Sequence, residues 1–328
     1  MNIAFTICSN NYLAQAKAFG DSLLQFNPGY QYVICLVDRL SPGVDYSFFE
    51  PYTIIPVEDI GIEGFEDMVE RYDITELNTA VKPFVIHYLF NRFPASGIVL
   101  YFDPDIIVFD QLTSLESQLT HNNIVLTPHF WTPIYDRHSL GEPDILNAGL
   151  YNLGFIGVKR SAETDAFLNW WMIKLKDQCY INFAKGLFVD QLWINFVPLY
   201  YEKVAILRHP GYNMAYWNLH ERTLINEGGR YYVNSKETPL VFYHFSGFGL
   251  KDEQKISKYQ DRFTFDNKPD VLPLFRYYAD ALKANRNELL SFEKCYFIEL
   301  KQRQSGERKK ASLVVRILRR LLREFEKK

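Results

Sequence analysis

The sequence has no long hydrophobic run and few cysteines, and both absences limit what the protein can be. No apolar stretch in the 328 residues approaches the roughly 20 that a helix needs to cross a bilayer. The N-terminus lacks the basic start and the apolar length of a signal peptide. The 4 cysteines are scattered, without the paired spacing of a metal site. These absences predict a reduced, cytoplasmic protein.

Net charge is also small, at −3, but it is unevenly distributed. Residues 301–328 carry eleven Lys or Arg and three Glu, so the remaining 300 residues have a net charge of −11. The acidic body argues against a nucleic-acid partner. Residues 313–325 have an apolar stripe at helical spacing flanked by arginines, which suits a helix lying on an anionic bilayer. A helix docked on the body or on a second subunit is the alternative.

The apolar and aromatic fractions, 48% and 16%, indicate a globular protein with aromatic-rich clefts. Buried-strand patterns alternate with helical patterns in the first hundred residues, which is typical of a mostly parallel sheet flanked by helices. Strands are expected at 2–8, 31–37, 53–57, 97–102, 123–128, 149–158, 203–207 and 240–245. Helices are expected at 12–26, 79–93 (broken near Lys82), 162–176, 189–196 and 271–302.

The most informative segment is 97–109, an apolar run with Asp103 and Asp105 at its centre and Pro104 between them. Carboxylates are rarely buried in such a run without a partner, because desolvating a lone charge is costly. In an extended chain, residues i and i+2 face the same way, so the two acids would point to one place. A divalent metal bound to a diphosphate is a plausible occupant, whereas two N-capping or salt-bridged acids are the alternative.

His244 and Gly247 lie near the end of a later strand pattern. A neutral imidazole would complete an O,O,N ligand set with Asp103 and Asp105, and such a set suits Mn²⁺. Gly247 would allow the backbone to turn close to a phosphate. A hydrogen-bonded histidine at a strand end is the simpler alternative for His244.

Five motifs in order give the sequence a resemblance to the retaining glycosyltransferases of family 8 or close relatives, which have the GT-A fold and an Asp-x-Asp motif. These motifs are Asn10-Asn11-Tyr12, Asp103-Pro104-Asp105, Asn152-Leu153-Gly154, Asp190-Gln191 and His244-Phe245-Ser246-Gly247. The resemblance covers about residues 1–250. It implies a Rossmann-like glycosyltransferase domain there. The residues that follow predict a helical extension at 251–305 and a basic amphipathic helix at 306–328.

The resemblance also implies roles for individual residues. Asp103, Asp105 and His244 would bind Mn²⁺ (or Mg²⁺), which bridges the diphosphate of a UDP-sugar donor. Asn11 and Tyr12 would lie at the base and ribose, and Lys82 near the donor. Asp190 would hold hydroxyls of the sugar, and Gln191 would lie next to the anomeric carbon. Tyr12 as a core aromatic, Lys82 as a solvated helix residue and Asp190 as an N-cap remain alternatives.

The function implied is transfer of a hexose from the nucleotide sugar to a saccharide or glycolipid acceptor, with retention, in polysaccharide biosynthesis. A front-face route without a strong base fits the sequence, and a covalent route through Asp190 is the alternative. Aromatic residues in polar segments could stack on an acceptor sugar or simply pack in loops; they are Trp131, Tyr135, Tyr212, Tyr216 and Trp217. A nucleotide-sugar or diphosphate hydrolase and an inactive sugar-nucleotide-binding protein are the other functions considered.

Overall fold

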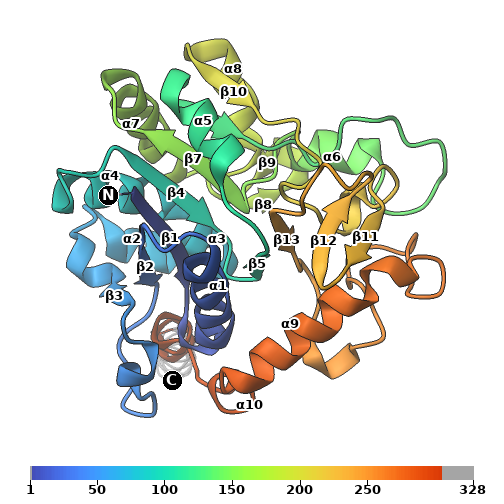
Figure 1. Ribbon diagram of the computed structural model, residues 1–328. Coiled ribbons are helices and arrows are strands. Elements are labelled where there is room, and N and C mark those ends of the chain that lie inside the picture. The colour runs from blue at the N-terminus through green and yellow to red at the C-terminus, as the bar shows by residue number, and fades with distance from the viewer. Residues whose placement is uncertain (1, 305–328) are drawn as a thin grey trace, which may run out of the picture.

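A seven-stranded sheet forms the centre of the protein, as described by a computed structural model of residues 2–304 (Figure 1). Its strand order is β10-β6-β7-β4-β1-β2-β3. The strands are β1 (Asn2–Cys8), β2 (Tyr30–Leu36), β3 (Thr53–Pro56), β4 (Ile98–Phe102), β6 (Ile124–Leu126), β7 (Phe155–Lys159) and β10 (Val204–Ile206). All neighbours pair in parallel except β7, which is antiparallel to β4 and β6. The sheet is therefore mostly parallel, as the sequence predicts.

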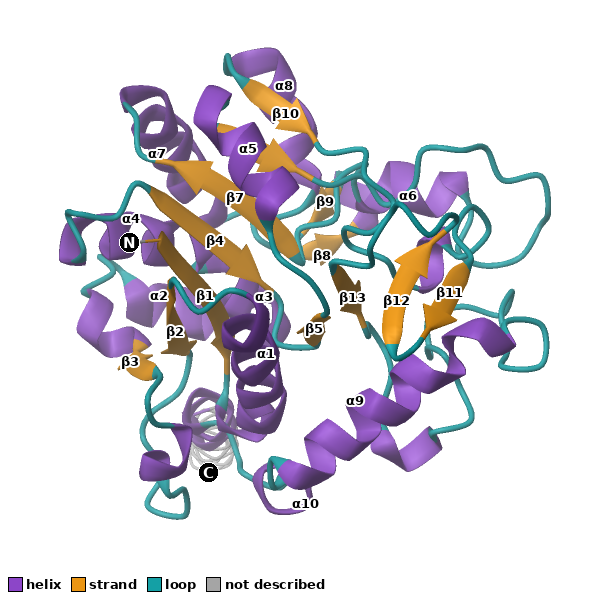
Figure 2. Ribbon diagram, in the orientation of Figure 1, coloured by secondary structure: helices purple, strands orange, loops and turns teal. Residues whose placement is uncertain are grey.

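Helices cover both faces of this sheet, because its strands are apolar on both sides. Side chains alternate between the two faces along β1. Ile3 and Phe5 pack with the helices of one layer, and Ala4 packs with the helices of the other layer. The first layer holds α2 (Phe65–Arg71), α3 (Ile74–Ala80), α4 (Lys82–Arg92) and α7 (Ala162–Leu175). The second holds α1 (Leu13–Phe26) and α5 (Thr113–His121), as Figure 2 shows.

A smaller unit lies beside the sheet and has its own hydrophobic cluster. It contains the antiparallel pairs β5 (Ile106–Val108) with β13 (Phe242–His244) and β11 (Leu224–Glu227) with β12 (Arg230–Val233). Helix α9 (Leu272–Ala284) packs against it, with the ring of Tyr278 stacked on Phe245 at 4.1 Å. Further elements are α6 (Glu142–Ala148), α8 (Val197–Tyr200), α10 (Asn287–Leu290), β8 (Ile181–Asn182) and β9 (Leu187–Phe188), and residues 296–304 are also helical.

Three predicted segments differ from the structure. The helix expected over 271–302 is interrupted, because Arg286 has a φ of +61° and ends the helical path after α9. The segment 189–196 forms a 3₁₀ helix over Leu192–Phe196, preceded by Val189 at φ +40°. The strand expected over 149–158 is confined to Phe155–Lys159. The break expected near Lys82 is confirmed, since α3 ends at Ala80 and α4 begins at Lys82.

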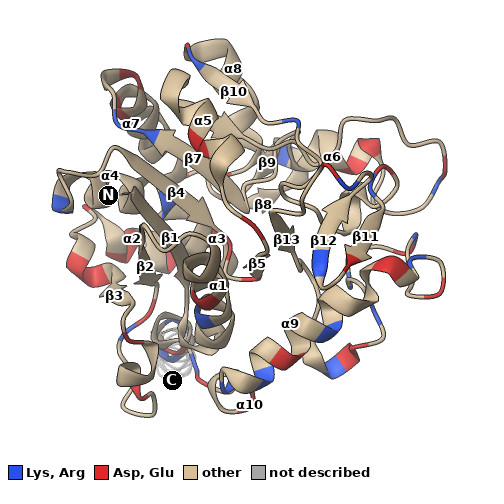
Figure 3. Cartoon of the chain, in the orientation of Figure 1, with Lys and Arg blue, Asp and Glu red and all other residues tan. Residues whose placement is uncertain are grey.

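Within the part of the chain that the structure describes, no helix combines the length and apolar character needed to cross a membrane. Acidic and basic positions are interspersed over the described elements (Figure 3). The predicted helix at 306–328 lies outside the described residues, so its association with a membrane stays a prediction. The predicted boundary at residue 250 also stays a prediction.

Candidate active site

The two aspartates lie in the turn that connects β4 to β5. Strand β4 ends at Phe102, Pro104 and Asp105 form a turn, and β5 begins at Ile106. The segment is therefore not extended as expected, because the chain turns at Pro104, which has no N–H for the strand ladder. The two carboxylates nevertheless point to one place, as the sequence predicts. The turn is fixed on its far side, where His244 pairs with Ile106 across the β13–β5 ladder.

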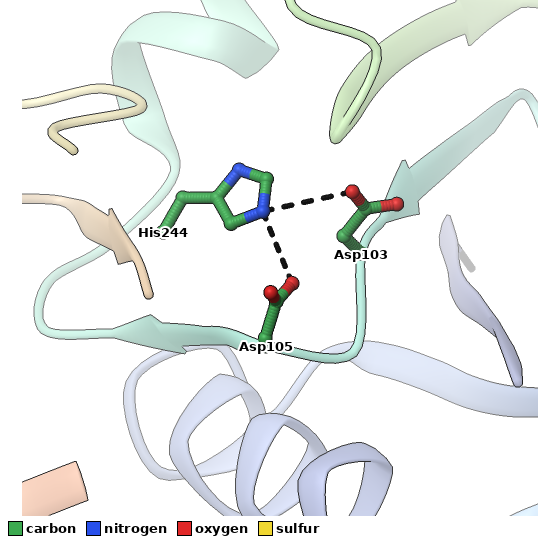
Figure 4. A group of neighbouring side chains, drawn as sticks. All are labelled: Asp103, Asp105 and His244. Carbon is green, nitrogen blue, oxygen red and sulfur yellow. Dashed lines mark ion pairs between the residues drawn. The ribbon is translucent and has the colours of Figure 1, made fainter. Parts of the chain in front are cut away.

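Asp103, Asp105 and His244 meet at the carboxyl end of the sheet (Figure 4). The Nε2 atom of His244 lies 3.0 Å from Oδ1 of Asp105 and 3.6 Å from Oδ2 of Asp103. One ligand atom from each residue falls within 4.8 Å of the others. Two carboxylates and one imidazole at this spacing fit the ligand preferences of Mn²⁺. Because the strand ends of an open α/β sheet form its usual ligand crevice, the position also fits a binding site.

Two hydrogen bonds hold Asp103 in place. The hydroxyl of Tyr101 donates to Oδ1 at 2.5 Å, and the backbone N–H of Asp103 donates to the carbonyl of Gly154 at 2.7 Å. The bond from Tyr101 occupies one carboxylate oxygen and leaves Oδ2 facing His244. Burial raises the pKa of the Asp103 carboxyl, and the positive charge of Lys82 opposes that rise.

His244 is buried and closely surrounded. Its ring stands edge-on to Trp217 with 5.1 Å between centroids, and its Nδ1 has no hydrogen-bond partner among the described residues. Burial lowers the pKa of His244, but the carboxylates of Asp105 and Asp103 outweigh it, so the net shift is upward. A divalent cation bound at Nε2 would instead favour the neutral form of His244, because a metal ion binds the unprotonated imidazole nitrogen.

Gly154 packs so closely against His244 that the position has no room for a side chain. A Cβ at this position would lie 2.7 Å from Nδ1 of His244 and 2.8 Å from Oδ1 of Asn152. Asn152 Oδ1 also accepts the N–H of Gly154 and the side-chain amide of Asn213. The Asn152-Leu153-Gly154 motif therefore packs directly behind the metal-ligand candidate, and any larger residue at 154 would displace the ring.

Lys82 and Asp190 form a buried ion pair, each with a side-chain exposure of no more than 2%. The Nζ of Lys82 lies 2.5 Å from Oδ2 of Asp190, donates to the carbonyl of Leu153 at 2.8 Å and lies 4.1 Å from the ring centre of Tyr101. Burial raises the pKa of Asp190, and the positive charge of Lys82 opposes that rise. Lys82 is thus neither a solvated helix residue nor a lining residue of the cleft described below, and Asp190 faces Lys82.

Gln191 is placed differently from its neighbour, because it lines the cleft. Its Oε1 accepts the N–H of Leu153 at 3.0 Å, and its Nε2 donates to the carbonyl of Ala148 at 2.9 Å. Gly149, at φ +118°, passes directly over the Gln191 side chain. These contacts fix the amide in one orientation on the wall of the cleft.

Two of the other predicted binding residues, Asn11 and Tyr12, follow the end of β1. Asn11 and the half-exposed Tyr12 line the cleft, so Tyr12 is not a core aromatic. Asn10 is fixed beneath them, because its backbone N–H and side-chain amide both donate to Asp38. Gly247, at φ +75°, has a local reason to be glycine, since a Cβ there would meet the ring of Tyr259. Its predicted contact with phosphate stays a prediction.

Asn11, Tyr12 and Gln191 line a cleft of about 1270 Å³ together with Asp103 and Asp105. His129 also lines the cleft, although no pattern in the sequence marked it. Burial lowers the pKa of this histidine to about 4. Of the five candidate stacking aromatics, Tyr216 and Trp217 line the cleft and Tyr212 is buried. The cleft is also lined by a C-terminal segment that includes Cys295, Ile298 and Glu299, for which the sequence carried no signal.

No family model matches the chain. It is 25% identical over 257 residues to the uncharacterized protein YfnF of Bacillus subtilis (strain 168), covering 77% of this chain and 84% of that protein. YfnD of the same organism, also uncharacterized, is 22% identical over 232 residues, covering 69% and 71%. The apo structure of the bifunctional glycosyltransferase WbbM superposes with a TM-score of 0.50 and 16% identity, covering 85% of this chain and 49% of that one. The shared fold confirms the predicted GT-A type α/β architecture.

Proposed function

We propose that the protein is a metal-dependent glycosyltransferase that moves a hexose from a UDP-sugar to a saccharide or lipid-linked acceptor with retention of configuration. The observation that carries the proposal is the convergence of Asp103, Asp105 and His244 at the edge of a large cleft. The fold shared with WbbM, which is named as a glycosyltransferase, is consistent with this reading.

The three residues would hold Mn²⁺ or Mg²⁺, and the imidazole ligand favours Mn²⁺. When bound, the ion supplies Lewis-acid stabilisation of the negative charge that develops on a diphosphate leaving group. The chain itself supplies the orientation. Tyr101 fixes one oxygen of Asp103, and the β13–β5 ladder fixes His244 relative to the turn that carries Asp105.

Other residues would position the two substrates. Asn11 and Tyr12 lie at the end of β1, where the nucleoside would sit. Gln191 uses one N–H on the carbonyl of Ala148, so the second N–H of its amide can meet the sugar. Tyr216 and Trp217 give the cleft an aromatic wall on which a sugar ring could pack.

The position of Asp190 favours a front-face route over a covalent one. A nucleophilic carboxylate must reach the anomeric carbon, whereas Asp190 is buried against Lys82. In the front-face route, the bond from the anomeric carbon to the phosphate oxygen breaks as the acceptor oxygen bonds to that carbon on the same face. The proton of the acceptor hydroxyl then passes to the departing diphosphate, so no protein base is required.

A thermal-shift screen of nucleoside diphosphates and nucleotide sugars, each with and without Mn²⁺, tests the proposal. We expect UDP and one UDP-sugar to raise the melting temperature only when Mn²⁺ is present, because binding to the folded state alone stabilises it by mass action. Product analysis of the stabilising sugar, with and without a saccharide acceptor, then distinguishes transfer from hydrolysis. Binding that is independent of Mn²⁺ and gives no product would contradict the proposal.

A further inference from the structure

The C-terminal segment forms one wall of the cleft next to the end of β1. The thiol of Cys295 and the hydroxyl of Ser9 both donate to the carbonyl of Val37, at 3.8 and 3.5 Å. Ser9 and Cys295 both line the cleft. Residues almost 300 positions apart in the sequence are therefore neighbours at the place where the nucleoside would bind.

Several contacts fasten this segment to the sheet. The backbone N–H of Tyr296 donates to Oδ1 of the buried Asp38 at 2.8 Å, while the other oxygen of Asp38 accepts from Asn10. The guanidinium of Arg39 lies 3.9 Å from the ring centre of Tyr296. On the next turn, Nζ of Lys301 donates to the carbonyl of Tyr72 at 2.8 Å. The wall is thus anchored through the carboxylate that also orients Asn10, the residue next to Asn11.

The residues that face the cleft follow a helical period. Residues 296–304 are helical, and Cys295, Ile298, Glu299 and Gln302 line the cleft at spacings of i, i+3, i+4 and i+7. This spacing places them on one face of the helix. The face combines an apolar side chain, Ile298, with a carboxylate, Glu299, and it lines the same cleft as Asn11 and Tyr12.

The carboxylate of Glu299 is available to a ligand. It retains a side-chain exposure of 35%, and its ion-pair partners, Lys294 at 3.7 Å and Arg303 at 3.4 Å, are both largely exposed. Exposed ion pairs of this kind contribute little, because solvent screens them and long side chains lose entropy in forming them. A hydroxyl donor from a bound molecule could replace either partner at small cost.

We propose that this helix face binds the nucleoside part of the donor, with Glu299 accepting hydrogen bonds from the ribose hydroxyls and Ile298 contacting the nucleoside through its apolar surface. The proposal rests on the proposed function and adds the nucleoside subsite to it. A carboxylate has acceptor oxygens only, and ribose offers two adjacent hydroxyl donors, so their hydrogen-bonding capacities match. Carboxylates bind ribose hydroxyls in the same way in dinucleotide-binding folds.

Calorimetric titration of the full-length protein with UDP in the presence of Mn²⁺ tests this inference. We expect Glu299→Gln to weaken UDP binding by about tenfold, because hydrogen bonds to a charged group are lost. Ile298→Ala should weaken it by about threefold to tenfold through lost apolar contact. Neither variant should change the affinity for Mn²⁺ or for pyrophosphate with Mn²⁺, since those ligands do not reach the helix.

Two controls separate the possible outcomes. Glu253→Gln removes an exposed carboxylate that pairs with Lys283, and this variant should bind UDP like the wild type. The Glu299→Gln effect should also disappear with 2′,3′-dideoxy-UDP, which lacks both hydroxyls. If wild type and Glu299→Gln bind UDP equally, the inference is wrong while the proposed function stands. If the wild type binds pyrophosphate with Mn²⁺ but not UDP, the subsite is not a nucleoside site; if it binds neither, the proposed function fails as well.

Discussion

Asp105→Asn is expected to reduce the turnover of the nucleotide sugar by at least about a hundredfold, because one charged metal ligand is lost. Asparagine keeps the size of the side chain but removes the negative charge, and Asp105 makes the shortest contact to His244 in the cluster, at 3.0 Å. Asp103→Asn should have a similar effect, since the Asp103 carboxylate approaches the same Nε2 atom of His244, at 3.6 Å. Initial rates measured against Mn²⁺ concentration would show the loss.

The matched control is Glu227→Gln, which removes a carboxylate from an exposed ion pair with Lys236. It should leave the rate unchanged. Melting curves without metal should show that Asp105→Asn is folded, because the substitution is isosteric and relieves the repulsion between two neighbouring carboxylates. A folded Asp105→Asn variant with the wild-type rate at saturating Mn²⁺ would remove the basis of the proposed function.

Lys82→Met should lower the free energy of unfolding by about 3–5 kcal/mol, because it leaves the Asp190 carboxylate buried without its partner. Lys82 also donates to the carbonyl of Leu153, and that acceptor would lose its hydrogen bond. Urea denaturation at neutral pH gives the measurement. Lys236→Met, which breaks an exposed pair, should change the stability by less than about 1 kcal/mol.

The pH dependence of this loss follows from the pKa of Asp190. Burial raises that pKa and Lys82 lowers it, so removing Lys82 lets the pKa rise further. A carboxyl with a folded-state pKa above its unfolded value destabilises the fold when it is ionised. The penalty in Lys82→Met should be full at neutral pH and shrink as the pH falls toward the ordinary range of an aspartate. Lys82→Met/Asp190→Leu should regain most of the stability, and a loss that is constant with pH would contradict this account.

The central fold was predictable because its strands are buried on both faces. Near-continuous apolar runs such as 2–8 and 31–37 indicate buried strands, and the polar residues after them mark the edge of the sheet where ligands bind. The smaller unit was harder to predict. Strand β5 is three residues long and obtains its stability from β13, more than 130 residues later, so no local pattern reveals the pairing.

The arrangement of the metal-ligand candidates also depends on contacts between distant parts of the sequence, which local patterns do not reveal. The apolar neighbours of Asp103 and Asp105 mark them as candidate site residues in the sequence. The turn at Pro104 and the contact with His244, however, depend on the pairing of β5 with β13. The pairing of Lys82 with Asp190 joins residues 108 positions apart, and their spacing in the sequence cannot show that each neutralises the other. Glu299 carried no signal, because a charged residue in a helical pattern is usually just solvated.

Diffraction from crystals grown with Mn²⁺ and UDP, recorded at the manganese absorption edge, tests the central claim most directly. We expect one strong anomalous peak at about 2.0–2.5 Å from carboxylate oxygens of Asp103 and Asp105 and from Nε2 of His244, with the diphosphate beside it. A manganese peak elsewhere, or a nucleotide bound while these three side chains stay hydrogen-bonded to one another, would contradict it.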